Sequence, residues 1–192
     1  MKTKATLLVL GSVLLCMLQT QAAIPKQQNL NIRKVAGLWY TSAMASVSHN
    51  FRNNYRGKKI WINFLQPRRS GNLVLRTLTE KGSSCEEDAI VLEKTEDPAL
   101  FRISNKRSSE FHLVKTNYRG YLIVYARNIY PWQNEVPILF LYGRSIFTKL
   151  CTMTLYRRLV RSLQLSEEGL FRLRKPWKCL NIDNWGKKNP LS

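Results

Sequence analysis

The stretch 119–144, RGYLIVYARNIYPWQNEVPILFLYGR, contains two short apolar runs separated by a segment rich in Asn and Pro. Runs of this length, bounded by turn-forming residues, predict two antiparallel strands at 119–127 and 137–144. In a sheet with one solvated face, apolar and polar side chains alternate along each strand. Here both alternating sets are largely apolar. The sequence therefore predicts that both faces of this part of the sheet are covered.

One cover is predicted immediately downstream, where residues 149–163 have the pattern of an amphipathic helix with Thr148 at the N-cap. Its apolar residues recur mainly at intervals of four, and three arginines lie on the opposite side. The apolar residues are Cys151, Leu155, Tyr156, Leu159, Val160 and Leu163, and the arginines are Arg157, Arg158 and Arg161. We expect the apolar side, with Cys151 buried in it, to pack on the outside of the sheet.

Six further apolar runs between turn signals predict six more strands. They lie at 38–47, 59–66, 72–79, 85–94, 99–104 and 110–115. With one face under the helix, the other face of the strands must line an interior. The predicted fold is all-β, an eight-stranded antiparallel up-and-down barrel with one C-terminal helix packed outside. Eight closed strands enclose a space wide enough for one small ligand.

The first 22 residues have the layout of a secretory signal peptide. Lys2 and Lys4 precede a largely apolar run over 5–18, and small residues follow near position 22. The run is shorter than the roughly 20 apolar residues that span a bilayer. We therefore expect a signal peptide at 1–22, one extracellular domain at 23–192, and no membrane-spanning segment.

Three short motifs resemble, in order and spacing, the signature regions of the lipocalin family. They are Gly37-x-Trp39 in the first strand, Thr116-Asn117-Tyr118 between the sixth and seventh, and Tyr142-Gly143-Arg144 at the end of the eighth. The resemblance covers about 30–183 and is strongest to secreted epididymal and reproductive-tract lipocalins. It implies that Trp39 plugs the closed end of the barrel, that Arg144 lies across its indole, and that Gly37 allows close approach of the preceding segment. Asn117 stands where the family more often has Asp.

The same resemblance implies a disulfide between Cys85 and Cys179. Cys16 lies in the predicted signal peptide, so Cys151 is left over. Lipocalins of the prostaglandin D synthase type use a cysteine nucleophile inside the cup. Because Cys151 belongs to the helical stripe, a structural thiol is favoured, and an intermolecular disulfide is the alternative.

Nothing else in the sequence favours catalysis. The two histidines, His49 and His112, have no metal-ligand spacing with cysteines, and no phosphate-binding glycine motif occurs. His112 is either a satisfied barrel residue or an exposed one. Seven acidic residues cluster, which is more typical of the solvated face of a hairpin than of acid/base or calcium chemistry. These are Glu80, Glu86, Glu87, Asp88, Glu93, Glu96 and Asp97. We predict a non-enzyme without cofactor or metal.

Strand alternation gives a candidate set of lumen residues that is mostly apolar and aromatic, as in small-molecule pockets. The set is Trp61, Asn63, Ile90, Leu92, Leu113, Ile123, Tyr125, Arg127, Ile138, Phe140 and Tyr142. It predicts a carrier of a small hydrophobic molecule of retinoid, fatty acid, steroid or odorant type. Arg127 would either pair with a ligand carboxylate or reach solvent at the rim. It is the only cation in the set, which argues against siderophore capture.

The formal net charge of +19 far exceeds what solubility requires. Basic residues gather in the first long loop, in the next turn and near the C-terminus: Arg52, Arg56, Lys58, Lys59, Arg68, Arg69, Arg157, Arg158, Arg161, Arg172, Arg174, Lys175 and Lys178. The alternative function is therefore a cationic extracellular protein that binds sulfated glycans or anionic cell or bacterial surfaces, in sperm coating or host defence. An unidentified cell-surface receptor is a further candidate partner. No nucleic-acid-binding module is recognisable, so nucleic acid is not an expected partner.

Overall fold

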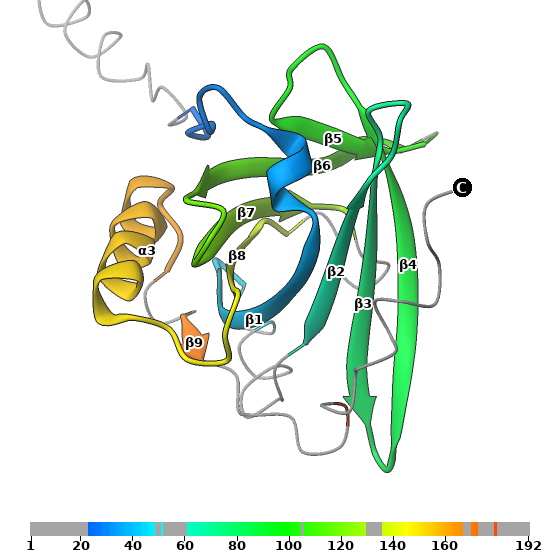
Figure 1. Ribbon diagram of the computed structural model, residues 1–192. Helices are drawn as coiled ribbons and strands as arrows, with labels where there is room; N and C mark the ends of the chain where they lie inside the picture. Colours follow the sequence, from blue (N-terminus) through cyan, green and yellow to red (C-terminus); the bar gives the residue numbers. More distant parts are fainter. Residues whose placement is uncertain are drawn as a thin grey trace, which may run out of the picture.

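A computed structural model describes residues 23–48, 51, 61–104, 106–129, 136–166, 170–172 and 179. Within these residues it contains a short 3-10 helix, one α-helix and nine strands (Figure 1). The elements are η1 (Ile32–Val35), β1 (Gly37–Ser46), β2 (Ile62–Pro67), β3 (Leu73–Lys81), β4 (Ser84–Lys94), β5 (Leu100–Ile103), β6 (Lys106–Thr116), β7 (Tyr121–Arg127), β8 (Ile138–Gly143), α3 (Leu150–Ser162) and β9 (Phe171–Arg172). No helix of the described residues is long and apolar enough to cross a lipid bilayer.

Strand β1 closes the sheet into a barrel, because its two halves pair with different neighbours. Its first half is antiparallel to β2, with Gly37 opposite Leu65, and its second half is antiparallel to β8, with Ser46 opposite Ile138. Strands β2 to β8 follow in sequence order, each antiparallel to the next. The predicted eight-stranded antiparallel barrel with one outer helix is confirmed. The short β9, which the sequence analysis missed, pairs with β1 at Ala43 and Met44.

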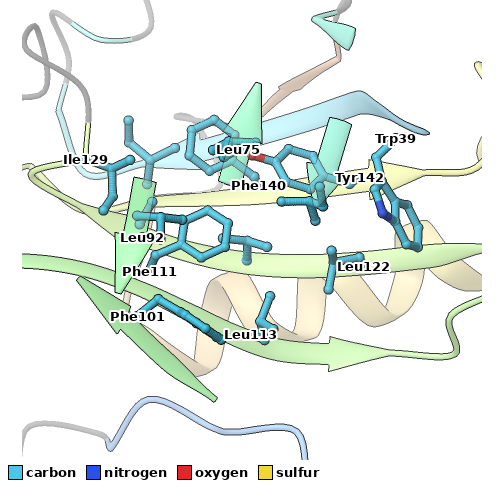
Figure 2. Packing of buried hydrophobic residues seen from close by; sticks show 14 of the residues in the cluster. Trp39, Leu75, Leu92, Phe101, Phe111, Leu113, Leu122, Ile129, Phe140 and Tyr142 are labelled. Carbon is cyan, nitrogen blue, oxygen red and sulfur yellow. The ribbon is translucent and has the colours of Figure 1, made fainter. Parts of the chain in front are cut away.

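Two apolar clusters cover the two faces of the barrel wall. The interior cluster contains Trp39, Met44, Leu65, Leu75, Leu92, Phe111, Leu113, Leu122, Val124, Phe140, Tyr142 and their buried neighbours; Figure 2 shows many of them converging between the strands. The outer cluster lies under α3 and contains Ala43, Ala45, Val114, Ile123, Tyr125, Leu139, Leu141, Met153, Tyr156, Val160 and Leu165. The Tyr156 hydroxyl donates to the Leu139 carbonyl oxygen at 2.6 Å and so fixes the helix to β8.

The barrel end at η1 and Trp39, called here the closed end, is held by Arg144. The indole of Trp39 is fully buried and its Nε1 donates to the Val35 carbonyl at 2.8 Å. The guanidinium carbon of Arg144 lies 3.6 Å from the centre of that ring, within cation–π range. Gly37 has a φ of +98°, and a Cβ there would lie 3.3 Å from Arg144 Nη1. The positive φ therefore favours glycine, and a Cβ would require the Arg144 guanidinium to shift slightly.

The turn between β6 and β7 shows why Asn117 fits at its position. Its Oδ1 accepts from the backbone N–H groups of Gly120 and Tyr121, at 2.8 and 3.0 Å. Thr116 Oγ1 accepts from the Tyr118 N–H at 2.8 Å and donates to the Tyr121 carbonyl at 2.7 Å. Because Asn117 bonds the turn through an acceptor oxygen, an Asp could make the same two bonds.

Two expectations about the helix are wrong. Helix α3 begins at Leu150, and its N-cap is Lys149 without a side-chain cap bond, so Thr148 does not cap it. Cys151 is exposed rather than buried in the helical stripe. The buried face of α3 is formed by Met153, Tyr156 and Val160. Their spacing of three and four residues follows the 3.6-residue helical repeat, whereas a spacing of four alone drifts around the helix.

The predicted disulfide between Cys85 and Cys179 is confirmed. The two Cα atoms lie 5.9 Å apart, and 94 residues separate the cysteines in sequence. Cys85 is in β4, whereas the chain shortly before Cys179 pairs with β1 through β9. The bond therefore ties the C-terminal segment to a part of the sheet three strands away from β1.

Candidate functional site

The barrel interior is the candidate binding site. Of the proposed lumen residues, the structure places six in the interior cluster, and Ile90 packs against it half-buried. These six are Trp61, Leu92, Leu113, Ile138, Phe140 and Tyr142. The centroid of the Phe140 ring lies 6.3 Å from that of Trp61 and 5.7 Å from that of Tyr142. An aromatic row therefore runs along one wall of the interior.

Asn63 supplies polar groups to this interior. It is fully buried on β2, and it shares its side of the strand with Trp61 and Leu65. Its Nδ2 donates to Thr41 Oγ1 at 2.7 Å, and its Oδ1 accepts from Thr77 Oγ1 at 3.1 Å. These three side chains, from β1, β2 and β3, form a polar group whose hydrogen bonds are made within the protein. Such a group does not demand a polar ligand atom.

The lumen side of β7 was predicted wrongly. Ile123 and Tyr125 belong to the outer cluster under α3, and the interior takes Leu122, Val124 and Ala126 instead. Arg127 is exposed and follows the alternation of Tyr125, so it does not point into the interior. Of the two roles considered for Arg127, the structure excludes pairing with a ligand carboxylate inside the barrel.

Several further interior residues were not predicted from the sequence. They are Met44, Leu65, Leu73, Leu75, Phe101, Phe111 and Ile129, besides the three on β7. Alternation alone could have found Leu65, which shares the side of Trp61 and Asn63, and Phe111, which shares the side of Leu113. It could also have found Leu73 and Leu75, which share one side of β3. Met44 could not be found in this way, because β1 changes register between Thr41 and Ala43.

The interior is closely packed by the protein's own side chains. Leu75, Leu113, Val124 and Phe140 are all 0 % exposed, so no water-sized space borders them. Trp61, at 8 %, and Phe51, at 7 %, retain the most accessible surface of the cluster. This differs from the open hollow expected from the sequence. A ligand that lies against these four residues must therefore displace side chains.

His112 lies on the outside of β6, beneath the N-terminal segment. It is 5 % exposed, its ring is edge-on to Tyr125 at 5.6 Å, and neither ring nitrogen has a hydrogen-bond partner within the described part of the chain. Burial lowers its pKa below the ordinary value, and Glu110, with Oε2 3.5 Å from Nε2, opposes that shift. Lys26 in the covering segment forms an ion pair with Asp97. The expectation of an exposed His112 is therefore wrong; the side chain is buried, but its ring nitrogens are not satisfied as the other reading expected.

Five of the clustered carboxylates lie on the β3–β4 hairpin, and Glu96 and Asp97 lie in the turn between β4 and β5. Glu87 pairs with Arg76, and Glu86 pairs with Lys81. Among the residues described, no three His, Cys, Asp or Glu side chains converge on a possible metal site. The basic residues of the first loop and the late ones at 174, 175 and 178 lie outside the described residues, as does His49.

Comparison with known proteins identifies relatives over most of the chain. Residues 36–176 match the model of the lipocalin / cytosolic fatty-acid binding protein family. Prostaglandin-H2 D-isomerase of Felis catus is 23 % identical over 177 residues, which cover 91 % of this chain and 93 % of that protein. Major urinary protein 20 of Mus musculus is 25 % identical over 145 residues, covering 76 % and 78 %. The solved siderocalin Ex-FABP superposes with a TM-score of 0.67 at 20 % identity, covering 75 % of this chain and 96 % of that one.

Proposed function

The chain belongs to the lipocalin / cytosolic fatty-acid binding protein family, and from that membership we propose that it is a secreted carrier of a small hydrophobic molecule. The interior carries this proposal, because a closed barrel surrounds a wholly apolar and aromatic cluster apart from the satisfied Asn63 group. Burying a ligand there would contribute about 25 cal/mol per Å² of apolar surface. Retinoid, fatty acid, steroid and odorant-like molecules all suit such a lining.

Titration with fluorescent fatty acid, retinoid and steroid probes tests the carrier function. We expect saturable binding of at least one probe with quenching of tryptophan fluorescence, because Trp61 is in the interior cluster. Ala126→Trp would fill the interior and should abolish binding. Val91→Trp, at a 48 % exposed position on the outside of β4, is the matched control and should bind normally. Circular dichroism verifies folding of both variants. Failure of every probe to saturate would overturn the carrier proposal.

Secretion is part of this proposal. The Cys85–Cys179 disulfide supports it, because such bonds form and persist in oxidising compartments. Residues 1–22 lie outside the described part, and we propose that they are removed as a signal peptide. N-terminal sequencing of protein from the medium of expressing cells should begin near residue 23. The reproductive-tract assignment stays a prediction from sequence.

We propose a carrier rather than an enzyme, although one relative is named an isomerase. Cys151 is exposed on α3 and Cys85 and Cys179 are bonded to each other, so none of these three cysteines offers a thiol to the interior. We expect no isomerisation of prostaglandin H2 above the uncatalysed rate. Turnover that disappears in Cys151→Ser would contradict this expectation.

The basic surface supports a second role, retention on sulfated glycans. At the closed end, exposed cations come from η1, from the β2–β3 turn and from the β6–β7 turn: Arg33, Lys34, Arg68, Arg69 and Arg119. Polyanion binding through such residues falls steeply with salt. The protein should elute from heparin late, and Arg68→Glu combined with Arg69→Glu should advance elution. Elution of the wild type at low salt would count against this role.

A further inference from the structure

The outward face of α3 and the residues before it form a surface that the carrier function does not use. We call it the helix patch and define it as Phe147, Lys149, Leu150, Arg157, Arg158 and Arg161. All six are exposed. Phe147, Lys149 and Leu150 lie at or just before the start of α3, Arg157 and Arg161 flank the buried face of the helix, and Arg158 lies opposite that face. Figure 1 shows α3 on the outer side of the barrel.

The patch has an apolar part that is unusually open to solvent. Leu150 is 79 % exposed and Phe147 is 68 % exposed, more than any other large apolar side chain in the described ranges. A shallow groove beside them is lined by Leu150, Cys151, Thr154, Leu155 and Arg158. Single exposed apolar residues are ordinary, whereas adjoining ones rimmed by polar groups mark a surface that contacts a partner.

The charged part of the patch has one sign only. Residues 136–166 contain no Asp or Glu, and the four cations of the patch all fall within this stretch. Arg157 and Arg161 are four residues apart, and Arg158 adjoins them, so the guanidinium groups share one side of the helix. The surface therefore combines local positive charge with exposed Phe147 and Leu150, and Leu150 lines the same groove as Arg158.

We propose that the helix patch docks the barrel on an anionic lipid bilayer. A basic amphipathic surface with Phe and Leu inserts its apolar side chains at the boundary between headgroups and acyl chains while its cations meet anionic headgroups. A sulfated glycan would use the arginines but would gain nothing from Leu150 and Phe147. A second copy of the chain would bring the same four cations against each other, which an isologous interface disfavours. The proposal holds whether or not the interior carries a ligand.

Vesicle flotation tests the docking. The protein is mixed with vesicles of phosphatidylcholine alone or of phosphatidylcholine with phosphatidylserine, at low and at physiological salt. We expect it to float with the anionic vesicles and not with the neutral ones. Arg157→Glu combined with Arg158→Glu should weaken binding by more than about tenfold, because each basic residue near such a surface contributes roughly fivefold.

The apolar part of the patch separates a bilayer from a glycan. Phe147→Ser combined with Leu150→Ser should weaken vesicle binding several-fold and leave elution from heparin unchanged. Val91→Ser and Arg68→Glu with Arg69→Glu are matched controls away from α3, and both should float with the anionic vesicles like the wild type. Binding to heparin alone, equal binding to both vesicle types, or full binding by the serine variant would overturn the proposal.

A probe on Cys151 gives a second readout, because this thiol is free, exposed and part of the groove lining. A polarity-sensitive fluorophore attached there should shift to shorter wavelength on addition of anionic vesicles. The same fluorophore on Val91→Cys in a Cys151→Ser background should not shift. A shift at both positions would show that the dye itself drives insertion and would remove this support, whereas no shift at Cys151 would contradict the docking geometry.

Discussion

The Arg144 side chain connects the end of β8 with two other backbone segments at the closed end, residues 34–38 and the β6–β7 turn. It donates to the carbonyls of Leu38, Ala36 and Tyr118 at 2.8, 2.9 and 3.1 Å, and to that of Lys34 at 3.2 Å. A lysine carries the same charge but has a single nitrogen and no planar group to lie over the indole. The structural contribution of this residue therefore depends on the guanidinium itself.

We expect Arg144→Lys to lower the free energy of unfolding by about 2–4 kcal/mol, because it loses several hydrogen bonds from a charged donor and the contact with Trp39. Arg68→Lys, in an exposed turn, is the control and should change stability by less than about 0.5 kcal/mol. Urea unfolding followed by tryptophan fluorescence measures both. Equal stability of Arg144→Lys and the wild type would show that charge alone suffices.

His112 makes stability depend on pH in a defined direction. Burial holds its pKa below the unfolded value of 6.5, so the unfolded chain binds more protons between the two values. The free energy of unfolding should therefore fall as pH drops below about 6.5. The charged groups around the ring are Glu110, Asp97 and Lys26, and Glu110 limits the loss.

Urea unfolding between pH 5 and pH 8 measures the slope of the free energy of unfolding against pH. His112→Gln should flatten it. Asp97 does not contribute to the change in stability between pH 5 and pH 8. Its hydrogen bond with Lys26 lowers its pKa from the ordinary 3.8, so its stabilising effect is lost only below this pH range. A slope that persists in His112→Gln would assign the titration to another group.

Strand β7 marks the limit of what alternation in a sequence can predict. The apolar character of both sides correctly indicated two covered faces, and the runs 119–127 and 137–144 gave β7 and β8 within two residues. The inward side could not be predicted, because both sides consist of large, mostly apolar side chains: Ile123 and Tyr125 on one, Leu122 and Val124 on the other. The position of α3 determines the inward side: Ile123 and Tyr125 join the apolar cluster under the helix, and the interior receives Leu122, Val124 and Ala126.

Helix α3 is attached to the barrel by one buried polar contact as well as by apolar packing. Burial raises the pKa of Tyr156 well above its ordinary value, so its hydroxyl stays protonated and donates to Leu139. Tyr156→Phe should lower the free energy of unfolding by about 1–2 kcal/mol, because a buried carbonyl loses a donor. The Tyr118 hydroxyl accepts from the Asn31 N–H in an exposed setting, so Tyr118→Phe should cost less. Thermal unfolding measures the loss of stability in both variants. Equal losses would show that the buried Tyr156 hydrogen bond contributes no more than the exposed Tyr118 one.

At the scale of the whole molecule, the sequence predicted the closed barrel and its number of strands, but it did not predict how tightly side chains fill the barrel interior. Turn signals and apolar runs are local, so they located the eight barrel strands. How tightly Trp61, Phe140 and Tyr142 fill the enclosed space depends on side chains from many strands at once, and no local pattern encodes that. The Cys85–Cys179 pairing was likewise accessible only through the family resemblance, because 94 residues separate the two cysteines.

That disulfide gives the prediction that concerns the whole chain. Closing a loop of 94 residues restricts the unfolded ensemble and should stabilise the fold by about 4–5 kcal/mol. Cys85→Ser combined with Cys179→Ser should therefore lower Tm by more than about 8 °C, as expected for a domain of this size. Cys151→Ser removes an exposed thiol instead and should leave Tm within about 1 °C. Reductant should not change the Tm of the double variant. It should lower the Tm of the wild type by the same amount as the two substitutions do. A double variant as stable as the wild type would mean that β9 and the barrel closure position the C-terminal segment without the covalent bond.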